Sequence, residues 1–286
     1  MNTQRDISKR LLRLFPVKVL KEHFYSTNVS DELYNEILNR NTKPLIDSFC
    51  YVNLEHTKQH IYIYNIRQAP TPNNLNLNQF PIDIVHQTNL NGVTSITISP
   101  IVDFRVILTN PFEETTLRFH QPIQIMLSNT HLIFYATILE KNMSNYFNQN
   151  RRVINAEKVN DELSIIEQVC AHFAHLNPTI CDLNRGIKQL WANDSVDSKY
   201  AKWKKDRSTT TETMDENYTL KSQYPDVYQN LVNAPLRKMI FKYLRDDEVL
   251  PDHFTVDPAS GQISIPLFSK NANQNKNVVR EILSNN

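Results

Sequence analysis

One short segment in the C-terminal half mixes cations with aromatic side chains. Residues 199–207 read KYAKWKKDR, and the side chains that could contact a ligand are Lys199, Lys202, Trp203, Lys204, Lys205 and Arg207. Mobile cations contact phosphates, and unpaired bases stack on aromatic rings. The segment therefore predicts a nucleic-acid-binding site for DNA or RNA. The structural alternative is a solvated helix face, with Trp203 packed inward and the lysines paired to nearby acids.

A second group of cations follows at helical spacing. Lys238, Lys242 and Arg245 stand at i, i+4 and i+7, opposite an apolar face that includes Met239 and Tyr243. This expected helix follows two others and precedes a hairpin, which is the order of elements in a winged helix. The recognition helix of a winged helix presents cations on the face away from its core. The turn at 257–261 would be the wing. It lacks Lys and Arg, and acids at 246–248 follow the helix, so an amphipathic helix beside a hairpin is the alternative.

A carboxylate pair followed by a lysine suggests a second chemistry. Asp182, Asp197 and Lys199 have the residue types that hold a divalent metal and direct a water molecule. Such triplets are common by chance, so a metal-dependent nuclease with Mg²⁺ is kept as an alternative, and no cofactor is expected otherwise. Asp103, with acids at 113 and 114, forms another acidic cluster that lacks a partnered lysine.

Zinc binding and nucleophilic catalysis have little support. Cys170, His172, His175 and Cys181 are close in sequence, but positions 170 and 172 of a helix point about 200° apart. They cannot converge on one tetrahedral ion without unwinding the helix, so no metal is expected there. The sequence also lacks a G-x-S-x-G nucleophile elbow.

Glycine is scarce, and this excludes several enzyme classes. The 286 residues include only three glycines, Gly92, Gly186 and Gly261, which lie far apart. A P-loop or a dinucleotide fingerprint needs two or three glycines within about ten residues. The sequence therefore predicts neither kind of nucleotide site. The formal net charge is only +1, so any affinity for a polyanion must come from a local patch.

Cysteine usage and hydropathy favour a cytoplasmic protein. Three cysteines and no C-x-x-C argue against a disulfide framework. No apolar run approaches the roughly 18–20 residues of a membrane-spanning helix, so no membrane insertion is expected.

The expected elements change in kind along the chain. Residues 1–41 have helical spacing, whereas 45–54, 60–66 and several short runs up to 139 alternate like strands. Helical spacing returns after about 143, and a turn at 257–261 joins two short strands. We expect an α+β protein with two domains. Residues 1–150 would hold an antiparallel sheet with flanking helices, and residues 151–286 a mostly helical domain that ends in a β-hairpin.

These patterns favour a non-enzymatic role. The leading hypothesis is a nucleic-acid-binding or regulatory subunit that contacts the DNA or RNA backbone through the basic segment and Lys238, Lys242 and Arg245. A structural or adaptor protein is the other alternative, and its natural surface would be the strand face around Tyr62 and Tyr64. A protein partner is expected in either case. Gly186 falls inside an expected helix, so either the helix ends near there or something packs closely against it.

Overall fold

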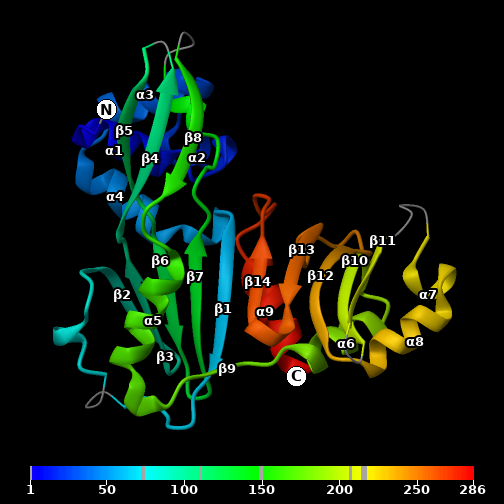
Figure 1. Cartoon of the computed structure of the whole chain (residues 1–286). Helices are drawn as coiled ribbons and strands as arrows, with labels where there is room; N and C mark the ends of the chain where they lie inside the picture. The colour runs from blue at the N-terminus through cyan, green and yellow to red at the C-terminus, as the bar shows by residue number, and fades with distance from the viewer. Residues whose placement is uncertain (1, 72–74, 110, 148–150, 206–207, 214–217) are drawn as a thin grey trace.

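The structure analysed is a computed structural model. It describes the whole chain except residues 1, 72–74, 110, 148–150, 206–207 and 214–217. The side chains of residues 30 and 199–213 are also outside the described part. Two antiparallel sheets organise the described residues. A small sheet with four helices forms one end of the molecule, and a wide sheet, called the main sheet below, runs through the remainder (Figure 1).

The main sheet has ten strands side by side, and the short β9 (Thr179–Ile180) pairs with β1 as an additional strand. All described pairings are antiparallel. In spatial order the strands are β11 (Ser208–Thr213), β10 (Val196–Lys205), β12 (Leu236–Tyr243), β13 (His253–Asp257), β14 (Gln262–Ile265), β1 (Gln59–Asn65), β7 (His131–Thr137), β6 (Ile123–Leu127), β3 (Val93–Ile98) and β2 (Ile84–Leu90).

Strand β1 joins the two halves of the chain. It pairs with β7 on one side and with β14 on the other, and Ile61 is the register partner of both Tyr135 and Ile263. The main sheet therefore contains strands from both sides of residue 150. The division into domains 1–150 and 151–286 stays a prediction.

The small sheet and the first four helices form the N-terminal lobe. The strand order is β5 (Glu113–His120), β4 (Ile101–Thr109) and β8 (Arg152–Lys158). The helices are α1 (Gln4–Leu12), α2 (Val17–Phe24), α3 (Ser30–Arg40) and α4 (Lys43–Val52). Thr3 caps α1, and Pro16 separates α1 from α2 because proline cannot continue a helix. Apolar side chains such as Phe15, Phe49 and Phe119 fill the core between helices and sheet.

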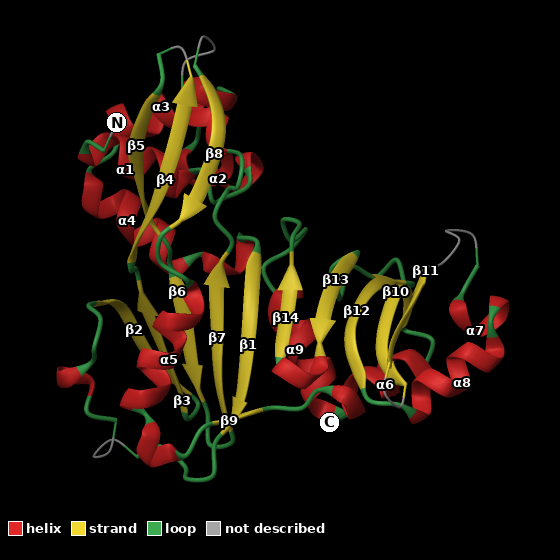
Figure 2. Ribbon diagram, in the orientation of Figure 1, coloured by secondary structure: helices red, strands yellow, loops and turns green. Residues whose placement is uncertain are grey.

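Helices cover different faces of the two halves of the main sheet. α5 (Glu162–His172) packs on β1, β7, β6 and β3. The opposite face, from β7 to β12, is covered by α6 (Asn184–Ala192), α7 (Leu220–Gln223), α8 (Pro225–Asn233) and α9 (Gln274–Ser284). Figure 2 shows α6 and α9 behind β14, β13, β12 and β10, and among the described elements no helix in front of them. We call this uncovered front surface the open face.

The expectation of a mostly helical C-terminal domain is wrong. Residues 196–205, 208–213 and 236–243 form strands β10, β11 and β12, and helices occur throughout the chain. In β12, Met239, Phe241 and Tyr243 are buried while Ile240 and Lys242 point to the other face. This period of two coexists with apolar residues at helical spacing, so a short apolar run fits both patterns. The segment forms a strand because it pairs with β10 on one side and with β13 on the other.

Two local predictions have opposite outcomes. The segment 45–54 was expected as a strand but lies mainly in α4, where Ile46, Phe49 and Cys50 bury one helical face and Pro44 occupies the first turn. The hairpin around 257–261 is confirmed as β13 and β14, with Gly261 at φ 63°. Glycine suits that left-handed backbone because it has no Cβ.

Gly186 lies where α6 meets α9. The helix does not end there, since α6 continues to Ala192. A Cβ at position 186 would lie 2.1 Å from the carbonyl oxygen of Ile282 in α9. Close approach of the two helices therefore requires glycine, although glycine costs a helix about 1 kcal/mol relative to alanine.

Candidate functional site

The basic segment lies on β10, the strand next to the edge strand β11 of the main sheet. Lys199, Lys202, Trp203, Lys204 and Lys205 belong to strand β10, and their side chains are outside the described part of the structure. Arg207 lies outside the described residues altogether. The backbone register pairs Lys202 with Lys238 of β12 and Trp203 with Leu236. The helical arrangement expected for this segment is therefore replaced by a strand.

The winged-helix analogy is contradicted by the same strands. Lys238 and Lys242 lie on β12, not on a recognition helix, and both are exposed. Arg245 follows the end of β12 and donates a hydrogen bond of 3.1 Å to Ser195 Oγ. The hairpin that would be the wing is built into the sheet, because β13 pairs with β12 and β14 pairs with β1.

Polar residues of neighbouring strands meet on the open face. The register aligns His60 of β1 with Ser264 of β14, Ser264 with Thr255 of β13, and Thr255 with Ile240 of β12. A shallow hollow of about 180 Å³ lies on this surface, lined by His60, Lys238, Thr255, Asp257, Gln262 and Ser264. The face is thus polar and partly solvated, whereas the opposite face is the apolar core.

The charge on the open face centres on Lys238. Among the described residues, neither Lys238 nor Lys242 has an acidic group within 4.0 Å, although Asp257 lines the hollow with Lys238. Lys242 lies nearer to acids, since it shares a second hollow with Asp246, Glu248 and Asp252. The register adds Lys202 directly opposite Lys238.

A buried carboxylate lies where β1 meets α5. Glu162, in the first turn of α5, accepts hydrogen bonds from His60 Nδ1 at 2.5 Å, Tyr62 Oη at 2.6 Å and Gln121 Nε2 at 2.8 Å. The ammonium group of Lys158 lies 3.7 Å away. The positive end of the helix dipole adds to this stabilisation. Glu162 therefore remains an anion and holds the ring of His60 through Nδ1.

The environment of Glu162 acts on its pKa in two directions. Burial raises the pKa, but the hydrogen bond and charge of His60, the hydroxyl of Tyr62 and the charge of Lys158 outweigh it and lower the pKa to about 2. The pKa of Tyr62 rises instead, because burial and the neighbouring carboxylate disfavour a phenolate. Since an ionised carboxylate only accepts hydrogen bonds, the proton of this pair lies on His60 Nδ1.

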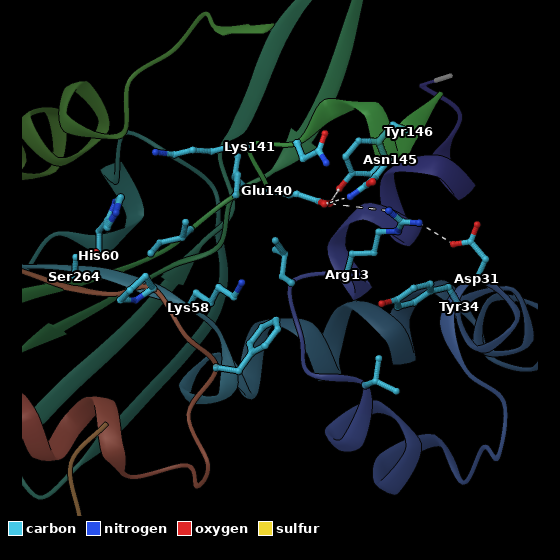
Figure 3. A pocket seen from close by; sticks show the side chains of 17 residues that line it. Arg13, Asp31, Tyr34, Lys58, His60, Glu140, Lys141, Asn145, Tyr146 and Ser264 are labelled. Carbon is cyan, nitrogen blue, oxygen red and sulfur yellow. Dashed lines mark hydrogen bonds and ion pairs between the residues drawn. The ribbon is translucent and has the colours of Figure 1, made fainter. Parts of the chain in front are cut away.

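His60 also lines an open cleft of about 850 Å³ between the N-terminal lobe and the ends of β1 and β14. At one end, Arg13 Nη2 donates to Asp31 at 2.7 Å, and Tyr146 Oη donates to Glu140 at 2.8 Å. The other end contains Lys58, His60 and Ser264 (Figure 3). The cleft and the open face adjoin at His60 and Ser264, which line both hollows.

The nuclease residues are not brought together. Asp182 precedes α6 and accepts from the backbone NH of Asn184 at 2.9 Å, whereas Asp197 follows α6 and accepts from the NH of Leu220 at 3.2 Å. The helix between them is about 13 Å long. Lys199 is on β10, and its side chain lies outside the described part.

The remaining acidic cluster and the candidate zinc ligands do not form a metal site in the described residues. Asp103 pairs with Arg118 at 3.0 Å. Cys170 lies beside the α5 face of the main sheet, and Cys181 is in the core on the opposite face. Within the described ranges, no three His, Cys, Asp or Glu side chains are grouped as a metal site would need.

The surface expected for an adaptor is covered. Tyr62 is buried beneath α5 and donates to Glu162. Tyr64 is half-buried beside the same helix, where its ring contacts Phe134. The aromatic strand face is therefore part of the protein's own core in the described structure.

No local sequence pattern predicts the His60–Glu162 pair. The two residues are 102 positions apart, and each has an ordinary local context: His60 on an alternating strand and Glu162 in the first turn of a helix. Only the packing of α5 on β1 brings them together.

The chain has no detectable relative among the families and curated proteins with which it was compared. No protein-family model matches the chain, and no curated protein matches its sequence significantly. Among the helices that the structure describes, none is long and apolar enough to cross a membrane.

Proposed function

We propose that the protein binds single-stranded nucleic acid through its phosphates on the open face, at strands β10, β12, β13 and β14. The observation that supports this most is the register pairing of Lys202 with Lys238 on adjacent strands. Lys238 and Lys242 are exposed, and four residues along a strand separate them by about 13 Å. This spacing suits two separate phosphates of an extended strand better than one compact anion.

The shape of the surface supports the same class of ligand. Six strands from β1 to β11 span about 24 Å at the usual spacing between strands. The backbone of a flexible single strand can adapt to a partly solvated sheet face. Since the net charge is only +1, attraction would come from this local patch. Binding would then be largely independent of base sequence and strongly salt-dependent.

Removing the three lysines tests the proposal. Lys202→Ala, Lys238→Ala and Lys242→Ala are combined in one variant, and binding to a fluorescent single strand of about 20 nucleotides is followed by anisotropy across a salt series. Losing three phosphate contacts should weaken binding at least tenfold and flatten the slope of log K against log salt by about 2.

A matched variant controls for the loss of charge. Arg185, Lys276 and Arg280 are exposed on α6 and α9, which cover the opposite face, and their replacement by Ala removes the same charge. The control should retain the wild-type affinity within about twofold. Equal weakening of both variants would assign binding to net charge alone and refute a site on the open face.

A further inference from the structure

The charges in the 850 Å³ cleft are unevenly balanced. At the end formed by the N-terminal lobe, Arg13 lies 2.7 Å from Asp31 and 4.0 Å from Glu140, so its charge is compensated. At the other end, Lys58 and Lys141 have no acidic group within 4.0 Å among the described residues. The ammonium group of Lys58 instead lies 4.6 Å from the centre of the Phe268 ring. An anion would therefore find uncompensated cations at this end only.

His60 adds a fixed polar group beside these cations. Its Nδ1 is engaged by Glu162, so Nε2 is the ring nitrogen left for a ligand in the cleft. In an imidazole ring that carries a proton on each nitrogen, Nε2 is a hydrogen-bond donor. Ser264, the register partner of His60, contributes a hydroxyl to the same wall.

Several apolar side chains also line the cleft, and two of them are exposed to solvent. Val17 is 37 % exposed and Phe268 is 39 % exposed. Leu14, Ile138 and Pro266 extend the same apolar lining. A ligand with a flat hydrophobic group would cover this surface, and the volume is within the range of about 300–1,000 Å³ that is typical of small-molecule sites.

We propose that the cleft binds an aromatic phosphate monoester of about mononucleotide size. Its phosphate would lie among Lys58, Lys141 and His60, and its aromatic group against Val17 and Phe268. Glu162 acts as a positioning residue because it touches His60 and not the ligand. This site does not depend on nucleic-acid binding at the open face.

Resonances of the His60 ring provide the test. The full-length protein is titrated with AMP, phenyl phosphate and adenosine, and the His60 signals are identified by their absence from the His60→Gln variant. AMP and phenyl phosphate should shift these signals saturably below about 1 mM, whereas adenosine, which lacks the phosphate, should bind at least tenfold more weakly.

A double lysine variant separates a site from general attraction. Lys58→Ala with Lys141→Ala should weaken AMP binding at least tenfold. The control, Lys18→Ala with Lys43→Ala, removes two lysines of the N-terminal lobe that pair with Glu22 and Asp47 outside the cleft, and it should bind like wild type. The inference fails if neither phosphate shifts His60 up to about 10 mM, if adenosine binds as well as AMP, or if both lysine variants behave alike.

Discussion

At the scale of single residues, Glu162 is a buried carboxylate that accepts three side-chain hydrogen bonds. A carboxylate taken out of water is costly unless hydrogen bonds and opposite charges replace its solvation. His60, Tyr62 and Gln121 supply the hydrogen bonds, and Lys158 supplies a nearby charge. The same network ties α5 to β1 and fixes one wall of the cleft, so it links the stability of the fold to the geometry of the site.

The lowered pKa of Glu162 makes stability depend on pH. Its pKa falls from 4.5, the value expected in the unfolded chain, to about 2 in the folded protein. The stabilisation is therefore complete above about pH 4.5 and is lost as the pH falls toward 2. At about 1.4 kcal/mol per pKa unit this amounts to about 3 kcal/mol. The free energy of unfolding, measured with urea between pH 6 and 2, should fall by this much more in wild type than in Glu162→Gln.

Other carboxylates titrate over the same range, and a second variant accounts for them. Glu167 is exposed on the same helix, so Glu167→Gln should follow the wild-type curve. Parallel curves for wild type and Glu162→Gln would contradict the role assigned to this carboxylate.

At the scale of elements, the strands of the C-terminal half show where sequence patterns are ambiguous. The segment 236–245 has apolar residues at helical spacing as well as an alternating subset, and its length fits either element. Hydrogen bonding to β10 and β13 decides the outcome, and that information lies in other parts of the chain. By contrast, Pro258 and Gly261 determine their turn locally, so the hairpin could be predicted.

Two truncations distinguish the strand from the helix. In the strand, Phe241 is fully buried, with an exposed fraction of 0 %, whereas Leu244 beyond its end is 41 % exposed. Phe241→Ala should therefore cost about 3–5 kcal/mol of unfolding free energy, and Leu244→Ala less than about 1 kcal/mol. A helix would bury Leu244 instead. Comparable losses for the two variants in urea unfolding would contradict the strand assignment.

The candidate site was predictable in composition but not in geometry. The run of cations at 199–207 pointed to Lys202, whereas Lys238 and Lys242 were singled out by a helical spacing that the structure replaces with strand β12. Their alignment on adjacent strands depends on register, which no local pattern reveals. The His60–Glu162 pair depends on a contact between residues 102 positions apart. Residue types can therefore be read from the sequence, whereas the fold determines which of those residues come into contact.

At the scale of the whole molecule, one antiparallel sheet connects both halves of the chain. Strand β1 from the first half lies between β7 and β14, while α5 and α9 cover opposite faces of the sheet. Because the helices change sides, no helix among the described elements covers the front of β14, β13, β12 and β10 (Figure 2). The open face thus follows from the arrangement of the helices and not from any single motif.

Ultraviolet cross-linking tests the binding role of the open face most directly. The full-length protein is irradiated with a thymidine single strand of about 20 nucleotides, and the cross-linked peptides are identified by mass spectrometry. We expect cross-links to peptides from β10, β12, β13 and β14, and their loss when Lys202, Lys238 and Lys242 are replaced by Ala. Absence of cross-links, or cross-links confined to α6, α9 or the N-terminal lobe, would contradict it.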